Sequence, residues 1–193
     1  MSLLVHLEDL VLADFGAGEL SAVRSALAAR PCADLPEVGR LKQFLDTLAV
    51  VQHREVDQVY VWAGTRLTAV LAKEYPALLR GHTSIRTVLL QLNQASGSAL
   101  AELLPEATAP DFWEEYLDAT TIRVGFDGPI EVKWLLEGIT GGLAGIFGER
   151  VETRRGVAPA ALPDRRLVDI QVVPDRRGMA RSTAGVTSAG SRG

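Results

Sequence analysis

The hydrophobic pattern changes period along the chain, and this change constrains the fold more than any other feature. Up to about residue 104, apolar residues recur every three or four positions, as in amphipathic helices. From Thr120 to Phe126, apolar and polar residues alternate, as in a strand with one buried face. The helical period then returns in a strongly apolar, glycine-rich segment from Ile130 to Phe147. This order predicts an α+β fold in which helices pack beside a small antiparallel sheet.

Helix-breaking residues and turn signals place the ends of these elements. The first helix is expected to stop before Gly16, and the fifth to end before Pro105. Phe126-Asp-Gly-Pro129 reads as a turn between a strand and the apolar helix. The other expected helices span about 19–29, 37–50, 56–73 and 83–104, and two further strands are expected near 150–154 and 166–173.

Charge is unevenly distributed between the two ends of the chain. Residues 1–149 carry 11 basic and 20 acidic side chains, whereas residues 150–193 carry 9 basic and 4 acidic ones. From Asp175 onward the sequence is rich in Arg, Ser and Gly and has no hydrophobic periodicity. We therefore expect one folded domain over residues 1–174 and a disordered tail over residues 175–193.

Composition excludes several functional classes. The single cysteine, Cys32, cannot form an internal disulfide, which favours a reducing, cytoplasmic compartment. One Cys and three His are too few for a Cys/His-rich zinc module, and the net charge of −4 argues against nucleic-acid binding. No run of about 18 apolar residues is present to span a membrane, and the N-terminus lacks the features of a signal peptide.

No catalytic motif is visible, so the chain is not expected to be an enzyme. A nucleophile elbow, a phosphate-binding P-loop, a zinc-protease helix and a dinucleotide-binding fingerprint are all absent. Gly-Ile-Thr-Gly-Gly at 138–142 lies inside a predicted helix, where close packing explains the glycines better than phosphate binding. Glu114 and Glu115 are expected on a solvated face.

The three histidines are the candidate ligands. His6 lies between apolar positions of the first helix, where it is expected in the core or at its boundary, or lining a pocket. His53 is expected to be exposed. His82 follows Gly81 at the start of the fifth helix, where its side chain could cap the helix or bond to backbone. Trp134, on the apolar helix, could line a cavity.

Four segments are informative in their order and spacing. They are the opening helix from Val5 to Gly16, the segment 75–84 with the sequence Tyr-Pro-Ala-Leu-Leu-Arg-Gly-His-Thr-Ser, the turn 126–130, and the helix 137–148. Together they resemble the haem nitric oxide/oxygen-binding (H-NOX) family, the sensor domain of soluble guanylate cyclases and bacterial gas sensors. The resemblance runs from Leu3 to about Val173. It implies a helical subdomain beside a four-stranded antiparallel sheet with helices.

The sequence departs from this family at the haem site. The position of the family's iron-ligating histidine falls on Gly97, which offers no ligand. The Tyr, Ser and Arg that hold the haem propionates in the family correspond here to Phe126, Gly128 and Ile130. These side chains provide no hydroxyl group and no cation, and burying unpaired carboxylates is costly. The resemblance therefore implies an H-NOX-like domain with no cofactor.

Two functional hypotheses follow from the resemblance. The first is a haem-free regulatory domain that binds a signalling partner of the kinase, cyclase, phosphodiesterase or chemoreceptor class, with an apolar small molecule as a further candidate ligand. The second is a haem-based sensor of NO or O2 with a substitute axial ligand, for which His82 is the first candidate and His6 the second.

Overall fold

The computed structural model describes residues 3–29, 35–74, 76, 79–89, 112–126, 129–156 and 166–174. Its helices are α1 (Leu3–Phe15), α2 (Ala17–Ala28), α3 (Glu37–Val51), α4 (Val56–Glu74), α5 (Ile85–Leu89) and α8 (Ile130–Phe147). Its strands are β1 (Phe112–Tyr116), β2 (Thr121–Phe126), β3 (Glu149–Arg155) and β4 (Arg166–Pro174). Among the residues described, no helix combines the length and hydrophobicity that a membrane span requires.

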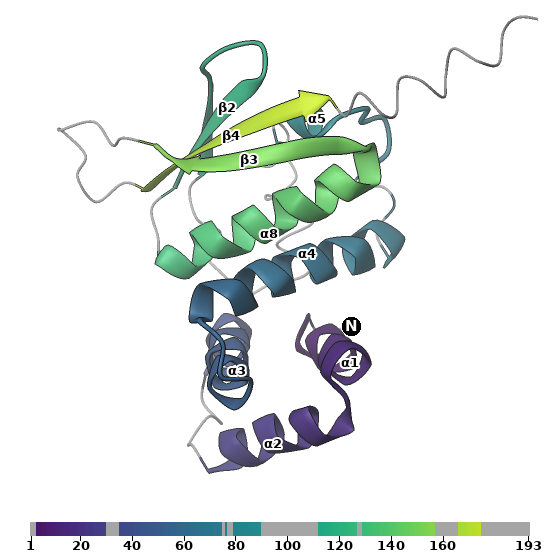
Figure 1. Ribbon diagram of the computed structural model, residues 1–193, viewed down its shortest axis with the longest axis vertical. Helices are drawn as coiled ribbons and strands as arrows, with labels where there is room; N and C mark the ends of the chain where they lie inside the picture. The colour runs from purple at the N-terminus through teal and green to yellow at the C-terminus, as the bar shows by residue number, and fades with distance from the viewer. Residues whose placement is uncertain are drawn as a thin grey trace, which may run out of the picture.

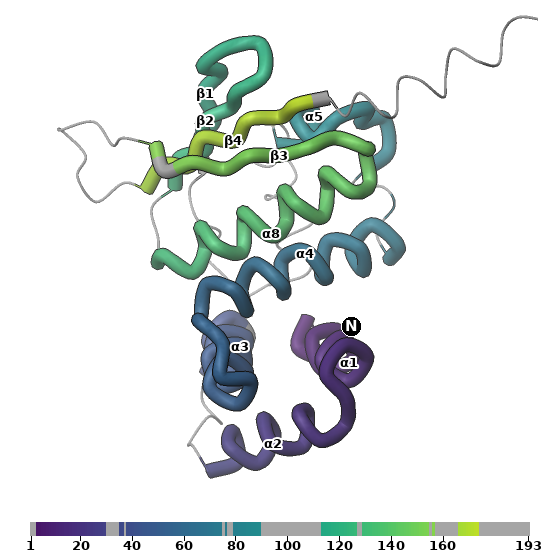
Figure 2. Tube along the Cα trace, viewed as in Figure 1, coloured from purple at the N-terminus to yellow at the C-terminus, as the bar shows by residue number. Residues whose placement is uncertain are grey.

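The elements are stacked in layers, with α8 in the middle (Figure 1). The sheet covers one side of α8, and α4 runs along the other side. Helices α1, α2 and α3 lie beyond α4, away from the sheet, and the tube in Figure 2 follows the same path. The fold is therefore α+β, and α8 is the element that connects the helical half to the sheet.

The sheet is antiparallel throughout and has the strand order β1-β2-β4-β3. Alternate residues of β2 and β4 are buried on one face of the sheet, as the period of two requires. Together with α5 and α8 this face forms one hydrophobic core. Its most buried members are Ile85, Leu89, Ile122, Val124, Phe126, Val168 and Ile170.

A second hydrophobic core lies among α1, α2, α3 and α4. It is built by the apolar face of each helix, as the helical period predicts. The residues in it that are almost fully inaccessible to solvent are Leu7, Val11, Val23, Phe44, Leu48, Ala49, Val59 and Ala63. The two cores lie on opposite sides of the contact between α4 and α8.

Most of the predicted elements are confirmed. The first helix ends before Gly16, and the apolar helix has the predicted limits. Helix α2 begins at Ala17 rather than Glu19, because the positive φ of Gly16 (94°) ends one helix and starts the next within a single residue. Of the fifth helix, α5 is described, and the remainder up to residue 104 lies outside the described residues, as do Cys32 and the predicted tail.

Strand β1 was not predicted from the hydrophobic pattern. Its sequence, Phe-Trp-Glu-Glu-Tyr, places two adjacent carboxylates in a strand, which masks the alternation. Glu115 is exposed as expected, but Glu114 is half-buried, so the prediction of a solvated face for both residues is wrong. Glu114 is the register partner of Val124 and therefore points to the buried face of the sheet.

Candidate functional site

Phe126 ends strand β2 and is completely buried. Its ring belongs to the core that β2 and β4 form with α5 and α8. In the ladder its register partners are Phe112 of β1 and Arg166 of β4. The position that the resemblance matches to the family's tyrosine is therefore a buried, apolar position at the end of an inner strand.

Ile130 is the first residue of α8 and is half-buried. Pro129 precedes it in an extended conformation, which suits a helix start, but supplies no side-chain hydrogen bond to the exposed N–H groups of the first turn. The next residue, Glu131, places a carboxylate in this turn, where the helix dipole favours negative charge. The start of α8 therefore offers an alkyl side chain followed by an acid.

A polar cluster joins the start of α8 to α3 and α4. Lys42 of α3 forms an ion pair with Glu131 and another with Asp46, whose Oδ2 lies 3.0 Å from the Lys42 Nζ. The Tyr60 hydroxyl of α4 donates a hydrogen bond to the Oδ1 of Asp46 at 3.0 Å. The Tyr60 ring contacts the Trp134 ring of α8, with centroids 6.0 Å apart. Trp134 thus packs against a helix of the other half of the molecule.

The charges of this cluster stabilise one another. The hydrogen bond to Glu131 raises the pKa of Lys42, although burial opposes the shift. Burial acts to raise the pKa of Glu131, but the hydrogen bond from Lys42, with smaller effects of the Glu131 backbone N–H and of Arg166, holds the pKa below its ordinary value. Burial and the Asp46 carboxylate raise the pKa of Tyr60. At neutral pH the cluster therefore contains a cationic lysine, a carboxylate at position 131 and a neutral phenol.

No described contact joins any of the candidate histidines to this cluster. His6 is buried in α1, with 7% of its surface exposed, which confirms a core or boundary position. His53 is exposed, as predicted, and has a positive φ of 51° in the turn after α3. His82 is half-buried, and its backbone N–H closes a turn to the carbonyl of Leu79.

The prediction that the His82 side chain caps the fifth helix or bonds to backbone stays a prediction, because no side-chain contact of His82 is described. Ser84 caps this helix start, because its hydroxyl accepts a hydrogen bond from the N–H of Thr87 at 3.4 Å. Glu149, at the start of β3, accepts a second hydrogen bond from the N–H of Ile85 at 2.8 Å. The start of α5 is thus fixed by a residue of the sheet.

The positions that hold haem in the H-NOX family are described in part. Gly97 and Gly128 lie outside the described residues. Phe126 and Ile130 offer a phenyl and an alkyl group, and Lys42, near Ile130, is already paired with two carboxylates. These residues do not fit the family's propionate clamp. In the described part of the chain, no group of three or more His, Cys, Asp or Glu is arranged to hold a metal ion.

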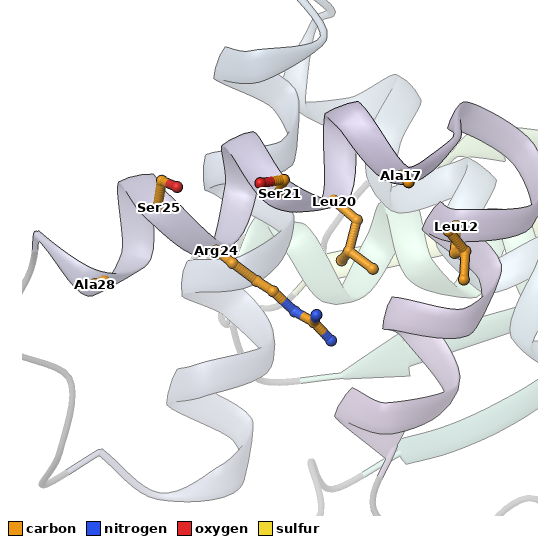
Figure 3. A pocket seen from close by; sticks show the side chains of 7 residues that line it. All are labelled: Leu12, Ala17, Leu20, Ser21, Arg24, Ser25 and Ala28. Carbon is orange, nitrogen blue, oxygen red and sulfur yellow. The ribbon is translucent and has the colours of Figure 1, made fainter.

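A separate open hollow of about 450 Å³ lies along α2 (Figure 3). Small and apolar side chains line most of it, and Arg24 extends from α2 toward α1. Arg24 Nη2 lies 2.6 Å from Glu8 Oε2, so the cation in the hollow is paired. The lining residues are Leu12, Ala17, Leu20, Ser21, Arg24, Ser25 and Ala28.

The sequence interpretation missed the Lys42 cluster. Lys42 and Asp46 are one helical turn apart, which is a local signal, but Glu131 is 89 positions further along the chain. Tyr60 lies on a third helix and has no charge to indicate an ionic partner. Only the packing of α3 and α4 against α8 brings these residues together.

Comparison with known proteins identifies the fold. No protein-family model matches the sequence, and no curated protein is significantly similar to it. The Fe(II) unliganded H-NOX protein from K. algicida has a TM-score of 0.71 and 16% identity, covering 89% of this chain and 96% of its own. The Fe(II)NO H-NOX protein from S. oneidensis has a TM-score of 0.71 and 17% identity, covering 89% and 99%.

A third solved structure also matches over most of the chain. It is a histidine-to-glycine mutant of the SO2144 H-NOX domain from Shewanella oneidensis in the Fe(II)CO ligation state. Its TM-score is 0.70 and its identity 17%, and the match covers 88% of this chain and 96% of that domain. These matches show that the chain has an H-NOX-like fold.

Proposed function

We propose that this H-NOX-like chain is a haem-free regulatory domain that acts by binding a signalling protein. The fold matches domains whose iron is described as unliganded, NO-bound or CO-bound. The residues that would bind such a cofactor are changed here, while the scaffold is retained. A scaffold of this kind supports a role in signalling rather than catalysis, with a partner of the kinase, cyclase, phosphodiesterase or chemoreceptor class.

The observation that carries the proposal is the complete burial of Phe126 in an apolar core. A tyrosine hydroxyl at this position would have to find a partner inside the core, and Phe126 removes that requirement. Ile130 similarly replaces a guanidinium, which pairs with carboxylates through a planar fork, by an alkyl chain. Two haem propionates would therefore meet apolar side chains at both positions.

Gly97 alone is a weaker argument for a haem-free domain. In the Shewanella protein a histidine was replaced by glycine, and the iron still carries CO. The proposal therefore rests mainly on Phe126 and Ile130, which would have to accommodate the propionates. Gly97 adds to it, because a glycine provides no ligand atom for iron.

The test is reconstitution of the purified protein with haemin, followed by its visible spectrum. We expect no saturable Soret band at one haem per chain. A sharp, stoichiometric band would contradict the proposal and favour the second hypothesis, a haem sensor of NO or O2 with another axial ligand. In that case His82→Ala and His6→Ala identify the ligand, since loss of the band in one variant assigns it.

The proposal also includes an apolar small molecule as a further ligand. An apolar small molecule in place of haem would stabilise the native state by about 2.7 kcal/mol at 100 times its dissociation constant. A thermal-shift screen with apolar compounds detects such a gain, and a flat screen leaves the partner protein as the ligand.

The single cysteine supports action in a reducing compartment such as the cytoplasm.

A further inference from the structure

Strand β3 forms one edge of the sheet. It stands last in the strand order, so β4 pairs with one of its sides, and among the described residues no strand pairs with the other. Figure 1 shows β3 at the margin of the sheet, with α8 on the face below it. The pairing with β4 is one to one from Glu149 to Arg155, and these residues include no proline, which protects many sheet edges. The free side of β3 is therefore a regular edge that another strand can join.

The backbone groups that face this free side can be assigned from two hydrogen bonds. The Gly156 N–H donates to the Leu167 carbonyl of β4 at 3.0 Å. The Val172 N–H of β4 donates to the Thr120 carbonyl at 2.9 Å, away from β3 and from its own register partner Val151. Hydrogen-bonded and non-hydrogen-bonded pairs alternate along an antiparallel ladder, so the odd-numbered residues of β3 direct their N–H and C=O groups to the free side. They are Glu149, Val151, Thr153 and Arg155.

Side chains of opposite charge alternate along the outer face of β3. The even-numbered residues lie on this face, because their partners on β4 alternate with the buried Ile170 and Val172. They are Arg150, Glu152 and Arg154, and all three are exposed. A row of like charges would repel a second copy of the same edge, which is one way in which natural sheets protect their edges. An alternating row is instead complementary to itself when two strands run antiparallel.

We propose that β3 is a self-association edge, at which two copies of this chain pair antiparallel about Val151 and join their sheets. In this register Arg150 lies opposite Glu152 of the second copy, and the symmetry of the pair gives this contact twice. These positions form non-hydrogen-bonded pairs, in which the two Cα atoms are about 4.5 Å apart and the side chains are closest. Val151 lies opposite its own copy and Glu149 opposite Thr153, and these pairs exchange the backbone hydrogen bonds.

Charge and burial select this register among those that the backbone allows. A pair centred on Glu152 would set each Glu152 against its own copy and Arg150 against Arg154, so that only like charges meet. A pair centred on Thr153 would set Glu152 against Arg154, which is complementary. It would also set the half-buried Val151 against the charged last residue of β3. The register about Val151 pairs opposite charges and places valine against valine.

Sedimentation velocity of the full chain over a range of concentrations tests the proposal. One pair of strands is a small interface, so we expect the native chain to dimerise weakly and in a concentration-dependent way. Arg150→Glu sets glutamates against each other at both symmetric positions, and the dissociation constant should rise by at least about tenfold. Glu152→Arg should have the same effect, because it sets arginines against each other.

An equimolar mixture of these two variants gives the sharpest result. One variant carries glutamate at positions 150 and 152 and the other carries arginine at both, so every contact between the two is a pair of opposite charges. We expect a heterodimer in the mixture at concentrations where each variant alone is monomeric. Mixing cannot repair a folding defect, so this recovery would come from the paired charges. A mixture that stays monomeric at concentrations where the native chain dimerises would overturn the inference.

Arg154→Glu is the matched control. It makes the same change of charge on the same face of the same strand, where Arg154 is 72% exposed. In the register about Val151 it lies opposite Gly148, so the dissociation constant should change by less than about twofold. An effect of Arg154→Glu as large as that of Arg150→Glu would contradict this register.

Thr153→Pro tests the backbone pairing independently of charge. It removes an N–H that faces the free side and none that bonds to β4, so the dimer should be lost while the sheet is retained. A folded Thr153→Pro variant that still dimerises would place the interface elsewhere and overturn the inference. If this variant does not fold, the charge variants and their mixture still decide the question. A native chain that stays monomeric up to about 1 mM would also overturn the inference.

Discussion

Gly64 of α4 and Gly138 of α8 bring the two helices together backbone against backbone. A Cβ atom on Gly64 would lie 3.0 Å from the Gly138 Cα and 2.9 Å from the Ile139 backbone N. A Cβ atom on Gly138 would lie 2.9 Å from the Thr65 backbone N. The Thr65 hydroxyl donates a hydrogen bond across the contact to the Gly138 carbonyl at 3.1 Å. Gly138 and Gly142 therefore serve close helix packing, as the sequence predicts, whereas a Cβ atom on Gly141 would lie 3.8 Å from the Thr65 hydroxyl, at ordinary contact distance.

Gly138→Ala should destabilise the protein. The added methyl group meets backbone atoms of α4, which cannot move aside as a flexible side chain can, so α8 must shift away. Overpacking of this kind costs about 1–3 kcal/mol. Gly145→Ala on the same helix is the control, because its Cβ meets nothing within 4 Å, and it should be neutral or stabilising by up to about 1 kcal/mol. Urea unfolding measures both, and equal effects would contradict the packing argument.

Asp118 should make the turn between β1 and β2 sensitive to acid. Its Oδ1 accepts hydrogen bonds from the N–H of Thr120 at 2.6 Å and the N–H of Thr121 at 2.8 Å. These bonds, led by that of the Thr120 backbone, lower the pKa of Asp118 to about 2. Because the folded pKa is depressed, the stabilisation is present above the unfolded pKa of about 3.9 and is lost as pH falls toward 2.

The measurement is the melting temperature against pH for the native chain and for Asp118→Ala. The difference between them should be constant at neutral pH and should shrink between about pH 4 and pH 2, as the native carboxylate becomes protonated. A difference that stays unchanged down to pH 2 would show that the carboxylate does not stabilise the turn. Asp57→Ala serves as a comparison. Among the described contacts, the Asp57 Oδ1 accepts one backbone hydrogen bond, from the N–H of Gln58 at 2.7 Å.

Arg123→Lys should weaken the outer face of the sheet. Arg123 Nε and Nη2 donate to the two carboxylate oxygens of Asp169 at 2.7 Å and 3.1 Å, and both side chains are less than a quarter exposed. Lysine cannot form this two-pronged bond, so we expect a loss of about 1 kcal/mol. Arg154→Lys is the control, because Arg154 is 72% exposed and pairs with Glu152 at 3.4 Å, and it should change stability by less than about 0.5 kcal/mol.

The fold was predictable where local pattern and packing agree. The limits of α8 follow from Pro129 at its start and from Gly148, with a φ of 65°, at its end, and both residues are visible in the sequence. Strand β1 was not predictable because its burial is set by neighbours. Trp113 of β1 lies over Gly125, which is its register partner on β2. The sequence predicted the strand that contains Gly125, but not the strand that pairs with it.

The candidate site was predictable only in its apolar part. Phe126 and Ile130 were singled out because the family resemblance expects polar residues at these two positions, and such a difference can be read one position at a time. Glu131 follows Ile130 in the sequence, but its ion pair needs Lys42, which lies on α3 and reaches Glu131 only through tertiary packing. A sequence pattern contains residue types and spacings, whereas this pair is created by tertiary contact.

Gly97→His should not restore stable haem binding on its own. Under the proposed function the variant supplies a nitrogen ligand, but Phe126 and Ile130 still offer only apolar groups to the propionates, and Lys42 still binds Glu131. Haemin titration followed at the Soret band is the measurement. Tight, stoichiometric uptake by Gly97→His alone would show that the propionate clamp is dispensable, and the argument from Phe126 and Ile130 would then fail.

Adding Ile130→Arg to Gly97→His separates the ligand from the clamp. Ile130 is half-buried at the start of α8, so an arginine there has access to solvent and can present its guanidinium to a carboxylate. We expect the double variant to bind haemin more tightly than Gly97→His, because one propionate regains a charged partner. Gly97→His with Ile130→Met is the control, since it changes the side chain without adding charge. Equal affinities of the two double variants would mean that position 130 does not face the propionates, and the loss of the clamp would then have to be located elsewhere.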